Sequence, residues 1–262
     1  MKKKFGEEKE YAFSVKNHVE IAEALNLTDF DSSARTTGNG FYYLQGDLAL
    51  LNQALIQHVI NKMVSKGFTY VETPLMLRKN VIAKVTDLHD QKNMIYKIDG
   101  EDLYLIGTSE HSLIGRYVDQ ILEEKQLPIK QTSYSMCFRK EIGSHGIDEK
   151  GFYRTHQFNK VEMIVICKPE ESEKFWEEMV DISVEIFKEL EVPFRITEIC
   201  SGDLGDLKQR QVDLEVYSPR QKNYFEVTSC SNLTEAQSRR LQIRVKKGQE
   251  KYFPHTLNNT AI

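Results

Sequence analysis

Residues 137–141 read CFRKE, residues 152–162 read FYRTHQFNKVE, and three glycines lie in or beside the segment between them. The two stretches belong to strand-like runs of apolar and β-branched residues, which we place at 133–141 and 152–167. Two such runs joined by a glycine-containing loop favour a long hairpin, and hairpins form antiparallel sheets. We therefore expect an α+β fold in which helices flank an antiparallel β-sheet.

Periodic patterns in the rest of the chain extend this arrangement. Apolar residues at helical spacing predict helices over 47–65, over a segment that includes 113–122, from Pro169 to Leu190, and from Thr234 onward. We expect Asp47 to cap the first helix, Gly67 to end it, and Gln237 to form a capping box with Thr234. Further strands are expected at 68–73, 103–106, 194–200, 211–217 and 223–229.

Charged residues interrupt these apolar strand-like runs. A buried charge costs several kcal/mol unless it is paired, so each of these residues needs a partner or a ligand. Arg139 and Glu141 are two residues apart, which predicts that both point to one face of a strand. Glu226 is likewise a charged residue inside an apolar strand-like run. On the second arm of the hairpin, the even-numbered positions, which should lie on one face of the strand, include Arg154, His156, Phe158 and Glu162.

These residue types suit a nucleotide and a small zwitterion. Guanidinium groups match phosphate and carboxylate groups, carboxylates accept protons of an ammonium or a hydroxyl group, and a ring can stack on adenine. Each residue also has a structural interpretation. An Arg–Glu pair across a hairpin is more often an ion pair, Phe158 is more often part of a core, and His156 is more often a hydrogen-bonded polar residue than a base.

Composition restricts the class of protein. The 262 residues carry a net charge of −4, which argues against a module that grips nucleic acid by bulk electrostatics. No apolar run is long enough to cross a bilayer and the first residues are charged, so we expect a cytoplasmic protein without a signal peptide. The four cysteines contain no C-x-x-C pair, and no Rossmann or P-loop glycine motif is present. We expect one continuous domain over 1–262, with 1–39 as its N-terminal segment.

The two arms of the hairpin closely resemble motif 2 of seryl-tRNA synthetases, which are class II aminoacyl-tRNA synthetases. Residues 40–47, the helix after them and the strand ending at Pro74 resemble motif 1, which builds the homodimer interface in class II enzymes. Residues 105–110 (LIGTSE) resemble the Thr-x-Glu loop of the family. The similarity continues in order through 225–232, the helix with Gln237, Arg239 and Arg240, and 255–260.

The resemblance implies a serine–tRNA ligase that activates L-serine with ATP and Mg²⁺ and serves tRNA(Ser). It makes Arg139 and Glu226 the catalytic residues, with Arg139 on the α-phosphate and the serine carboxylate. The implied serine contacts are Thr108, Glu110, Arg139, Glu162, Asn258 and Thr260. The implied ATP contacts are Arg139, Glu141, Arg154, Phe158, Glu226, Thr228 and Ser229, of which Glu226 and Ser229 also meet the magnesium ion. No side chain is needed as a general base, because the serine carboxylate itself attacks the α-phosphorus.

The chain also departs from the family pattern. The resemblance does not include an N-terminal helical arm, and it stops before motif 3, so we expect a fragment of the core with exposed apolar sheet surface and low stability. Two alternatives remain open: a paralogue that loads an amino acid onto a carrier protein, and a dimeric binding protein without catalysis. No cysteine neighbours Thr108 or Thr260, so we expect no zinc in the substrate pocket.

Overall fold

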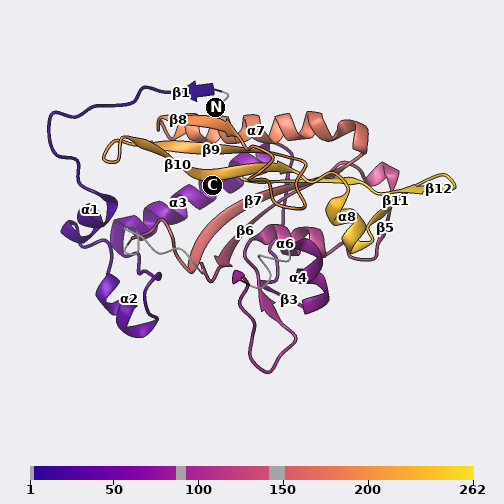
Figure 1. Cartoon of the computed structure of the whole chain (residues 1–262), viewed down its shortest axis with the longest axis horizontal. Helices are drawn as coiled ribbons and strands as arrows, with labels where there is room; N and C mark the ends of the chain where they lie inside the picture. Colours follow the sequence, from indigo (N-terminus) through magenta and orange to yellow (C-terminus); the bar gives the residue numbers. More distant parts are fainter. Residues whose placement is uncertain (1–2, 87–92, 142–150) are drawn as a thin grey trace.

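The computed structural model describes residues 3–86, 93–141 and 151–262. Its centre is an eight-stranded sheet in the order β1-β8-β9-β10-β13-β7-β6-β2. Neighbouring strands of this sheet are antiparallel, apart from β2 and β6. Helices lie on both sides of the sheet (Figure 1), so the predicted α+β fold with a flanked antiparallel sheet is confirmed.

The strands of the large sheet are β1 (Lys3–Phe5), β2 (Thr69–Tyr70), β6 (Ile129–Phe138), β7 (Gln157–Cys167), β8 (Phe194–Glu198), β9 (Arg210–Ser218), β10 (Asn223–Asn232) and β13 (His255–Thr260). Two smaller sheets contain β3 (Met76–Leu77) with β4 (Tyr104–Leu105), and β5 (Ile121–Glu123) with β11 (Arg244–Lys247) and β12 (Glu250–Tyr252). The α-helices are α1 (His18–Ala24), α2 (Phe30–Thr36), α3 (Gly46–Ser65), α4 (Lys79–Val85), α6 (Ser109–Gly115), α7 (Ser172–Glu189) and α8 (Ala236–Leu241). Short 3-10 helices span Glu124–Gln126 and Pro169–Glu171.

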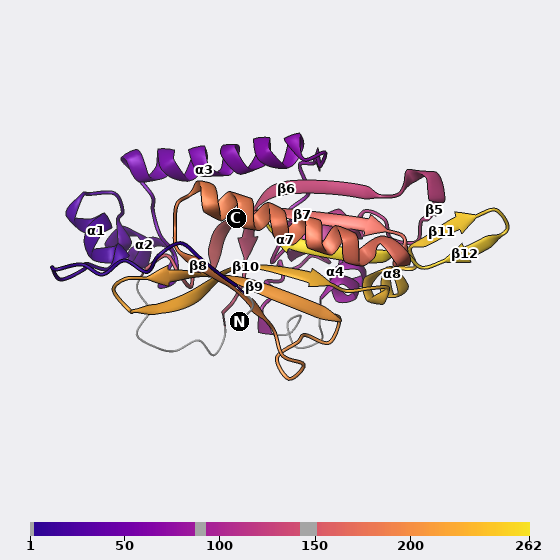
Figure 2. The same ribbon diagram turned by 90° about the horizontal axis from the view of Figure 1, so that it is seen from above.

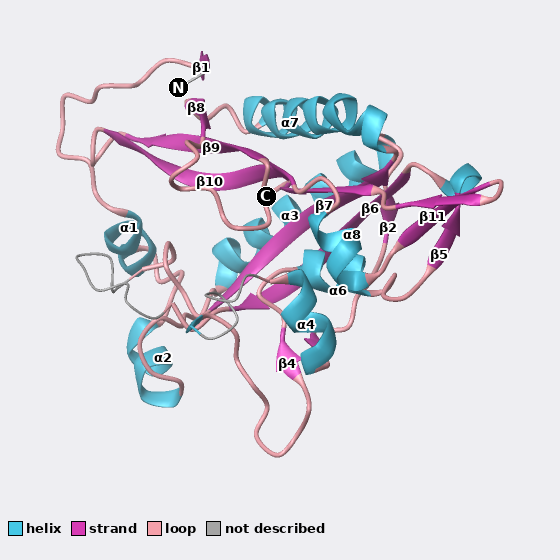
Figure 3. Cartoon of the chain, turned by 45° about the vertical axis from the view of Figure 1, so that its right-hand side comes forward, coloured by secondary structure: helices cyan, strands magenta, loops and turns pink. Residues whose placement is uncertain are grey.

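The two faces of the sheet have different covers. Helices α3 and α7 pack on one face, and α4, α6 and α8 lie on the other (Figures 2 and 3). Strand β7 serves both cores because its side chains alternate: Val161, Met163 and Val165 join the α3–α7 side, whereas Ile164 and Ile166 join the α6–α8 side. This alternation also puts Glu162 and Lys160 on the side of α6, where the cavity lies.

The predicted hairpin is confirmed, but its strands are shorter than expected. Strands β6 and β7 pair from Ile129↔Ile166 to Phe138↔Gln157. The prediction that Arg139 and Glu141 share a strand face is wrong, because β6 ends at Phe138 and Glu141 has φ +47°. Likewise, β7 begins after Arg154 and His156. The loop glycines Gly143 and Gly146 lie outside the described residues; Gly151 is described.

The helix predicted through 113–122 is too long. Helix α6 ends at Gly115, and Asp119 has φ +58°, which a helix cannot accommodate. Ile121 and Leu122 then form β5, which pairs in parallel with β11. The partner strand is more than a hundred residues away in sequence, so a local pattern could not indicate this pairing.

Two predicted helix caps are also wrong, and one helix end is confirmed. Helix α8 begins at Ala236; Thr234 has φ +48°, and the Gln237 side chain bonds to Glu110 and Thr256 instead of a helix terminus. Helix α3 begins at Gly46, so Asp47 lies in its first turn and does not cap it. Gly67, with φ +83°, ends α3 as predicted; the backbone N–H groups of Gly67 and Phe68 donate to the carbonyls of Val64 and Met63.

Within the part of the chain that the structure describes, no helix combines the length and apolar character that crossing a bilayer requires.

Candidate active site

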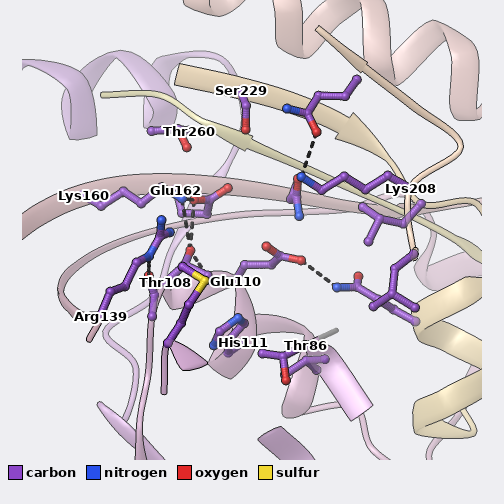
Figure 4. Close-up of a pocket in the computed structure, with 18 of the residues that line it drawn as sticks. Thr86, Thr108, Glu110, His111, Arg139, Lys160, Glu162, Lys208, Ser229 and Thr260 are labelled. Carbon is purple, nitrogen blue, oxygen red and sulfur yellow. Dashed lines mark hydrogen bonds and ion pairs between the residues drawn. The ribbon is translucent and has the colours of Figure 1, made fainter. Parts of the chain in front are cut away.

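A cavity of about 360 Å³ lies on the α6–α8 side of the sheet, lined from β7, β10, β13, α6, α8 and the loop before β9 (Figure 4). Eight of the residues predicted for the site line it: Thr108, Glu110, Arg139, Glu162, Glu226, Ser229, Asn258 and Thr260. Seven polar residues among the described lining were not predicted for the site: Thr86, His111, Lys160, Asp203, Lys208, Gln211 and Gln237. Of these, Lys160 shares the strand parity of Glu162, a sequence signal that could have identified it.

The other four predicted residues lie outside the cavity lining. Arg154 and Glu141 form an ion pair, with Nη1 and Oε2 3.2 Å apart. Phe158 packs beside the cavity, with the Arg139 guanidinium carbon 5.1 Å from its ring centroid, a cation–π contact. The fourth is Thr228, which is turned away from the cavity.

A β-bulge in β10 explains the position of Thr228. Glu226 pairs with Glu215 and Thr228 with Leu214, so Val227 is an extra residue in the ladder. Strict alternation would put residues 226 and 228 on one face. The bulge instead leaves Glu226 and Ser229 on the cavity side, while Thr228 faces a small void beside α7.

A hydrogen-bonded network occupies the floor of the cavity. Glu162 is 1% exposed, and its Oε2 lies 2.5 Å from the ammonium nitrogen of Lys160. The hydroxyl of Thr108 donates to the same oxygen at 3.1 Å and accepts from Lys160 at 3.3 Å. Thr108 also caps α6 by accepting a bond from the backbone N–H of Glu110 at 3.3 Å. The network therefore holds a buried carboxylate and a hydroxyl in fixed positions beside the cavity.

A second carboxylate, Glu110, is held by a separate chain of hydrogen bonds. The amide nitrogen of Gln237 donates to Oε1 of Glu110 at 2.6 Å, and the Thr256 hydroxyl donates to the Gln237 amide oxygen at 2.9 Å. Burial, followed by the nearby charge of Glu162, raises the pKa of Glu110 above its ordinary value of 4.5. A bound cation would therefore stabilise the charged form of this carboxylate strongly.

His111 is an uncharged, buried imidazole in the cavity wall. It is 7% exposed, and its Nδ1 has no hydrogen-bond partner within the described chain. Burial, assisted by the positive charges of Arg139 and Lys160, lowers its pKa to about 3. The imidazole therefore carries no charge at neutral pH and adds none to the cations already present.

Glu226 and Ser229 provide the oxygen atoms of the β10 wall. Burial and then the charge of Asp213 raise the pKa of Glu226, and Lys208 and Arg139 oppose that rise. Carboxylate and hydroxyl oxygens are ligands that Mg²⁺ accepts, commonly in company with substrate phosphates. In the described ranges no group of three or more His, Cys, Asp or Glu residues could hold a metal ion by itself. The two side chains therefore fit a magnesium ion that arrives with a polyphosphate.

Replacing Glu110 by glutamine is expected to stabilise the chain at neutral pH. The folded-state pKa of Glu110 is raised, so the folded state binds more protons than the unfolded state between the two pKa values, and stability falls as the pH rises through that window. Glutamine keeps the shape without the charge. We expect Glu110→Gln to raise the melting temperature at pH 7 by about 2–4 °C, roughly 1 kcal/mol.

The gain should shrink in melts recorded at progressively lower pH, because protonation removes the charge of the carboxyl group. Glu101→Gln, at an exposed position, is the matched control and should leave the melting temperature unchanged. A lower melting temperature for Glu110→Gln at pH 7 would contradict the prediction.

Known proteins share both the sequence and the fold. The serine–tRNA ligase of Methanospirillum hungatei is 44% identical over 99% of this chain and 62% of that protein. The serine–tRNA ligase of Thermoplasma acidophilum is 43% identical over 94% of this chain and 56% of that protein. The chain thus spans about three fifths of the length of these relatives.

Solved structures agree with this relationship. The seryl-tRNA synthetase of Pyrococcus horikoshii, complexed with ATP, superposes with a TM-score of 0.94 at 42% identity, covering 96% of this chain and 57% of that one. The cytoplasmic serine–tRNA ligase of Naegleria fowleri, in complex with AMP, superposes with a TM-score of 0.93 at 33% identity. The match covers 99% of this chain and 63% of that one. Residues 94–262 match the family described as the tRNA synthetase class II core domain (G, H, P, S and T). This chain belongs to the class II tRNA synthetase core domain family.

Proposed function

We propose that this chain is the serine-activating core of a serine–tRNA ligase, acting in the cytoplasm. The observation that carries the proposal is Glu162, a buried carboxylate that bonds to the Thr108 hydroxyl on the cavity floor and pairs in the sheet with Thr260. The relatives named above are serine–tRNA ligases, and two related structures contain ATP or AMP. The proposed reaction joins L-serine to the α-phosphate of ATP and releases pyrophosphate.

The polar groups of the cavity match the shape of serine. Glu110 takes the ammonium group, and Glu162 with Thr260 takes the hydroxyl group. Asn258 lies on the same strand as Thr260 and contacts the backbone of the amino acid. Alanine lacks the hydroxyl group and would leave the polar atoms of Glu162 and Thr260 unpaired, so the site rejects it strongly.

ATP occupies the side of the cavity nearer β10 in this proposal. Arg139 binds the α-phosphate and the serine carboxylate, while Glu226 and Ser229 hold the magnesium ion that accompanies ATP. The serine carboxylate oxygen forms a bond to the α-phosphorus, the bond from that phosphorus to the bridging oxygen breaks, and pyrophosphate leaves with the electron pair. Arg139 stabilises the charge that develops at the α-phosphate.

Three more residues complete the proposed adenine site. Phe158 supplies a ring face, and Arg154 covers the opposite face of the base. Glu141 meets the edge of the base beside its ion pair with Arg154. Thr228 is left out of the proposed site because its side chain faces α7.

Serine-dependent exchange of pyrophosphate into ATP tests this function directly. We expect exchange with L-serine and Mg²⁺, and none above background with L-alanine or L-threonine. Equal exchange with alanine would contradict the proposed role of Glu162 and Thr260. Absence of exchange with any amino acid, together with absence of ATP binding, would reject the function.

We further propose that the chain forms a homodimer through the outer face of α3 and that tRNA(Ser) receives the activated serine. Leu50, Leu51 and Val64 on that face are 69%, 63% and 51% exposed. An apolar outer face on a helix whose inner face is already buried is typical of a protein interface.

Leu51→Glu is expected to convert the dimer to a monomer, because it places a charge in an apolar interface. Sedimentation velocity at micromolar concentration measures the change. Gln249→Glu, at an exposed position in the turn between β11 and β12, adds the same charge outside α3 and should leave the dimer intact. A monomeric unaltered chain would reject the interface.

A further inference from the structure

Among the described residues, three cations line the cavity, and they differ in how they are paired. The ammonium group of Lys160 is matched by Glu162 at 2.5 Å. Arg139 donates from Nε to the carbonyl of Gly107 at 3.1 Å. Lys208 donates to the side-chain oxygen of Gln211 at 2.8 Å, and among the described residues no carboxylate oxygen lies within 4 Å of it. Lys208 therefore brings a positive charge into the cavity and is hydrogen-bonded to a neutral group, while the carboxylates of Asp213 and Glu226 interact with that charge from a longer distance.

The position of Lys208 is set by a chain of buried polar groups. Gln211 is 9% exposed and Asp213 is 6% exposed. The amide nitrogen of Gln211 donates to the Asp213 carboxylate at 2.6 Å, so the amide oxygen of Gln211 is turned toward Lys208. A hydrogen bond from the amide nitrogen fixes the orientation of the side-chain amide, and therefore the direction in which its oxygen can accept. The lysine ammonium group is thus held at a defined point of the cavity wall.

Lys208 and Arg139 approach the cavity from different sides. Figure 4 shows Arg139 near Thr108 and Glu162, and Lys208 extending from the opposite side of the view toward the wall that carries Ser229. Lys208 comes from the loop before β9, which also brings Asp203 and Leu207 to the cavity. Arg139 and Lys208 therefore face the ligand space from two directions, with the oxygen atoms of Glu226 and Ser229 on the side toward which Lys208 extends.

We propose that Lys208 binds the outer phosphates of ATP and the pyrophosphate that leaves. This inference rests on the proposed function, in which Arg139 binds the α-phosphate and Glu226 with Ser229 holds the accompanying magnesium ion. A lysine acts as a mobile point charge on phosphate oxygens, and negative charge grows on the leaving pyrophosphate as its bond to the α-phosphorus breaks. Of the other carboxylates of the cavity, Glu110 and Glu162 lie toward the proposed serine end, and Asp203 comes from the same loop as Lys208. Because Lys208 lies on the side of Glu226 and Ser229, we assign it to the nucleotide.

Calorimetric titration of the chain with ATP, AMP and pyrophosphate, each in the presence of Mg²⁺, tests this assignment. Lys208→Met removes the charge and keeps most of the side-chain length. We expect it to raise the Kd for ATP and for pyrophosphate by about tenfold, the effect of losing one charge-assisted contact. The Kd for AMP, which has no outer phosphates, should change less than about twofold. Lys208→Arg should recover most of the affinity for ATP.

The control is Lys246→Met at an exposed position of β11, which removes the same charge outside the cavity lining and should leave all three Kd values unchanged. Equal weakening of ATP and AMP by Lys208→Met, or no weakening of either, would overturn the assignment while leaving the proposed function intact. If the unaltered chain binds neither nucleotide, the proposed function fails and this inference fails with it.

Discussion

Arg139→Ala is expected to lower serine-dependent ATP–pyrophosphate exchange by about 10²–10³-fold, the usual cost of removing one donor that stabilises charge in a transition state. Arg139 lines the cavity beside Gly107 and Phe158, whose contacts hold the guanidinium group in place. In the proposed reaction it is the side chain that meets both the attacking carboxylate and the α-phosphate. Its loss should therefore reduce kcat more than it raises KM for ATP.

Two variants separate this role from a structural one. Arg139→Lys keeps the charge but not the planar pair of donors, so we expect it to remain well below the unaltered rate. Arg244→Ala removes an exposed arginine on β11 and should exchange at the normal rate. The prediction fails if Arg139→Ala keeps kcat within a factor of about two of the unaltered chain.

Glu162→Ala is expected to have the largest effect on stability, a loss of about 3 kcal/mol, because it leaves the ammonium group of Lys160 without its partner in a largely buried position. The Lys160 side chain is 13% exposed and that of Glu162 is 2% exposed. The Thr108 hydroxyl loses its acceptor at the same time. Denaturant unfolding at pH 7 measures the change.

The double variant Lys160→Ala/Glu162→Ala distinguishes an unpaired charge from simple loss of volume. Because both charges are absent, we expect it to be more stable than Glu162→Ala alone, although it leaves a larger cavity. Lys130→Ala/Glu178→Ala, a more exposed pair at 2.6 Å on the other face of the sheet, is the matched control. Additive effects of the two substitutions at 160 and 162 would contradict the proposed coupling.

Much of the fold follows from local patterns. The antiparallel hairpin, the helix α3 with its glycine end and the helix α7 were all predicted, because period-two and period-3.6 apolar patterns identify which face of an element is buried. The boundaries were less accurate: β6 ends before Arg139 and β7 begins after His156. The central strand β13 was not predicted as a strand, since its partners β7 and β10 are distant in sequence.

The sequence also predicted most of the residue types of the site. Charges inside apolar strands indicated Glu162 and Glu226, because a charge in such a place needs a partner or a ligand. The resemblance added Thr108, Glu110 and Thr260, all of which line the cavity. Whether each contact with serine or ATP exists stays a prediction, which the exchange and binding experiments address.

Sequence alone was therefore sufficient for the fold class, the family and the chemical types of most cavity residues, since these depend on motifs and on periodic burial. The tertiary structure was needed to assign individual side chains. A single bulge at Val227 turned Thr228 away and kept Ser229 in the cavity, and a nonlocal bond took Gln237 from a helix cap to Glu110. Lys160 and Lys208 carry the same charge, but Lys160 forms an ion pair with a carboxylate, whereas the hydrogen-bond partner of Lys208 among the described residues is an amide. Such differences arise because the partners of a buried polar group are set by chain segments that meet only on folding.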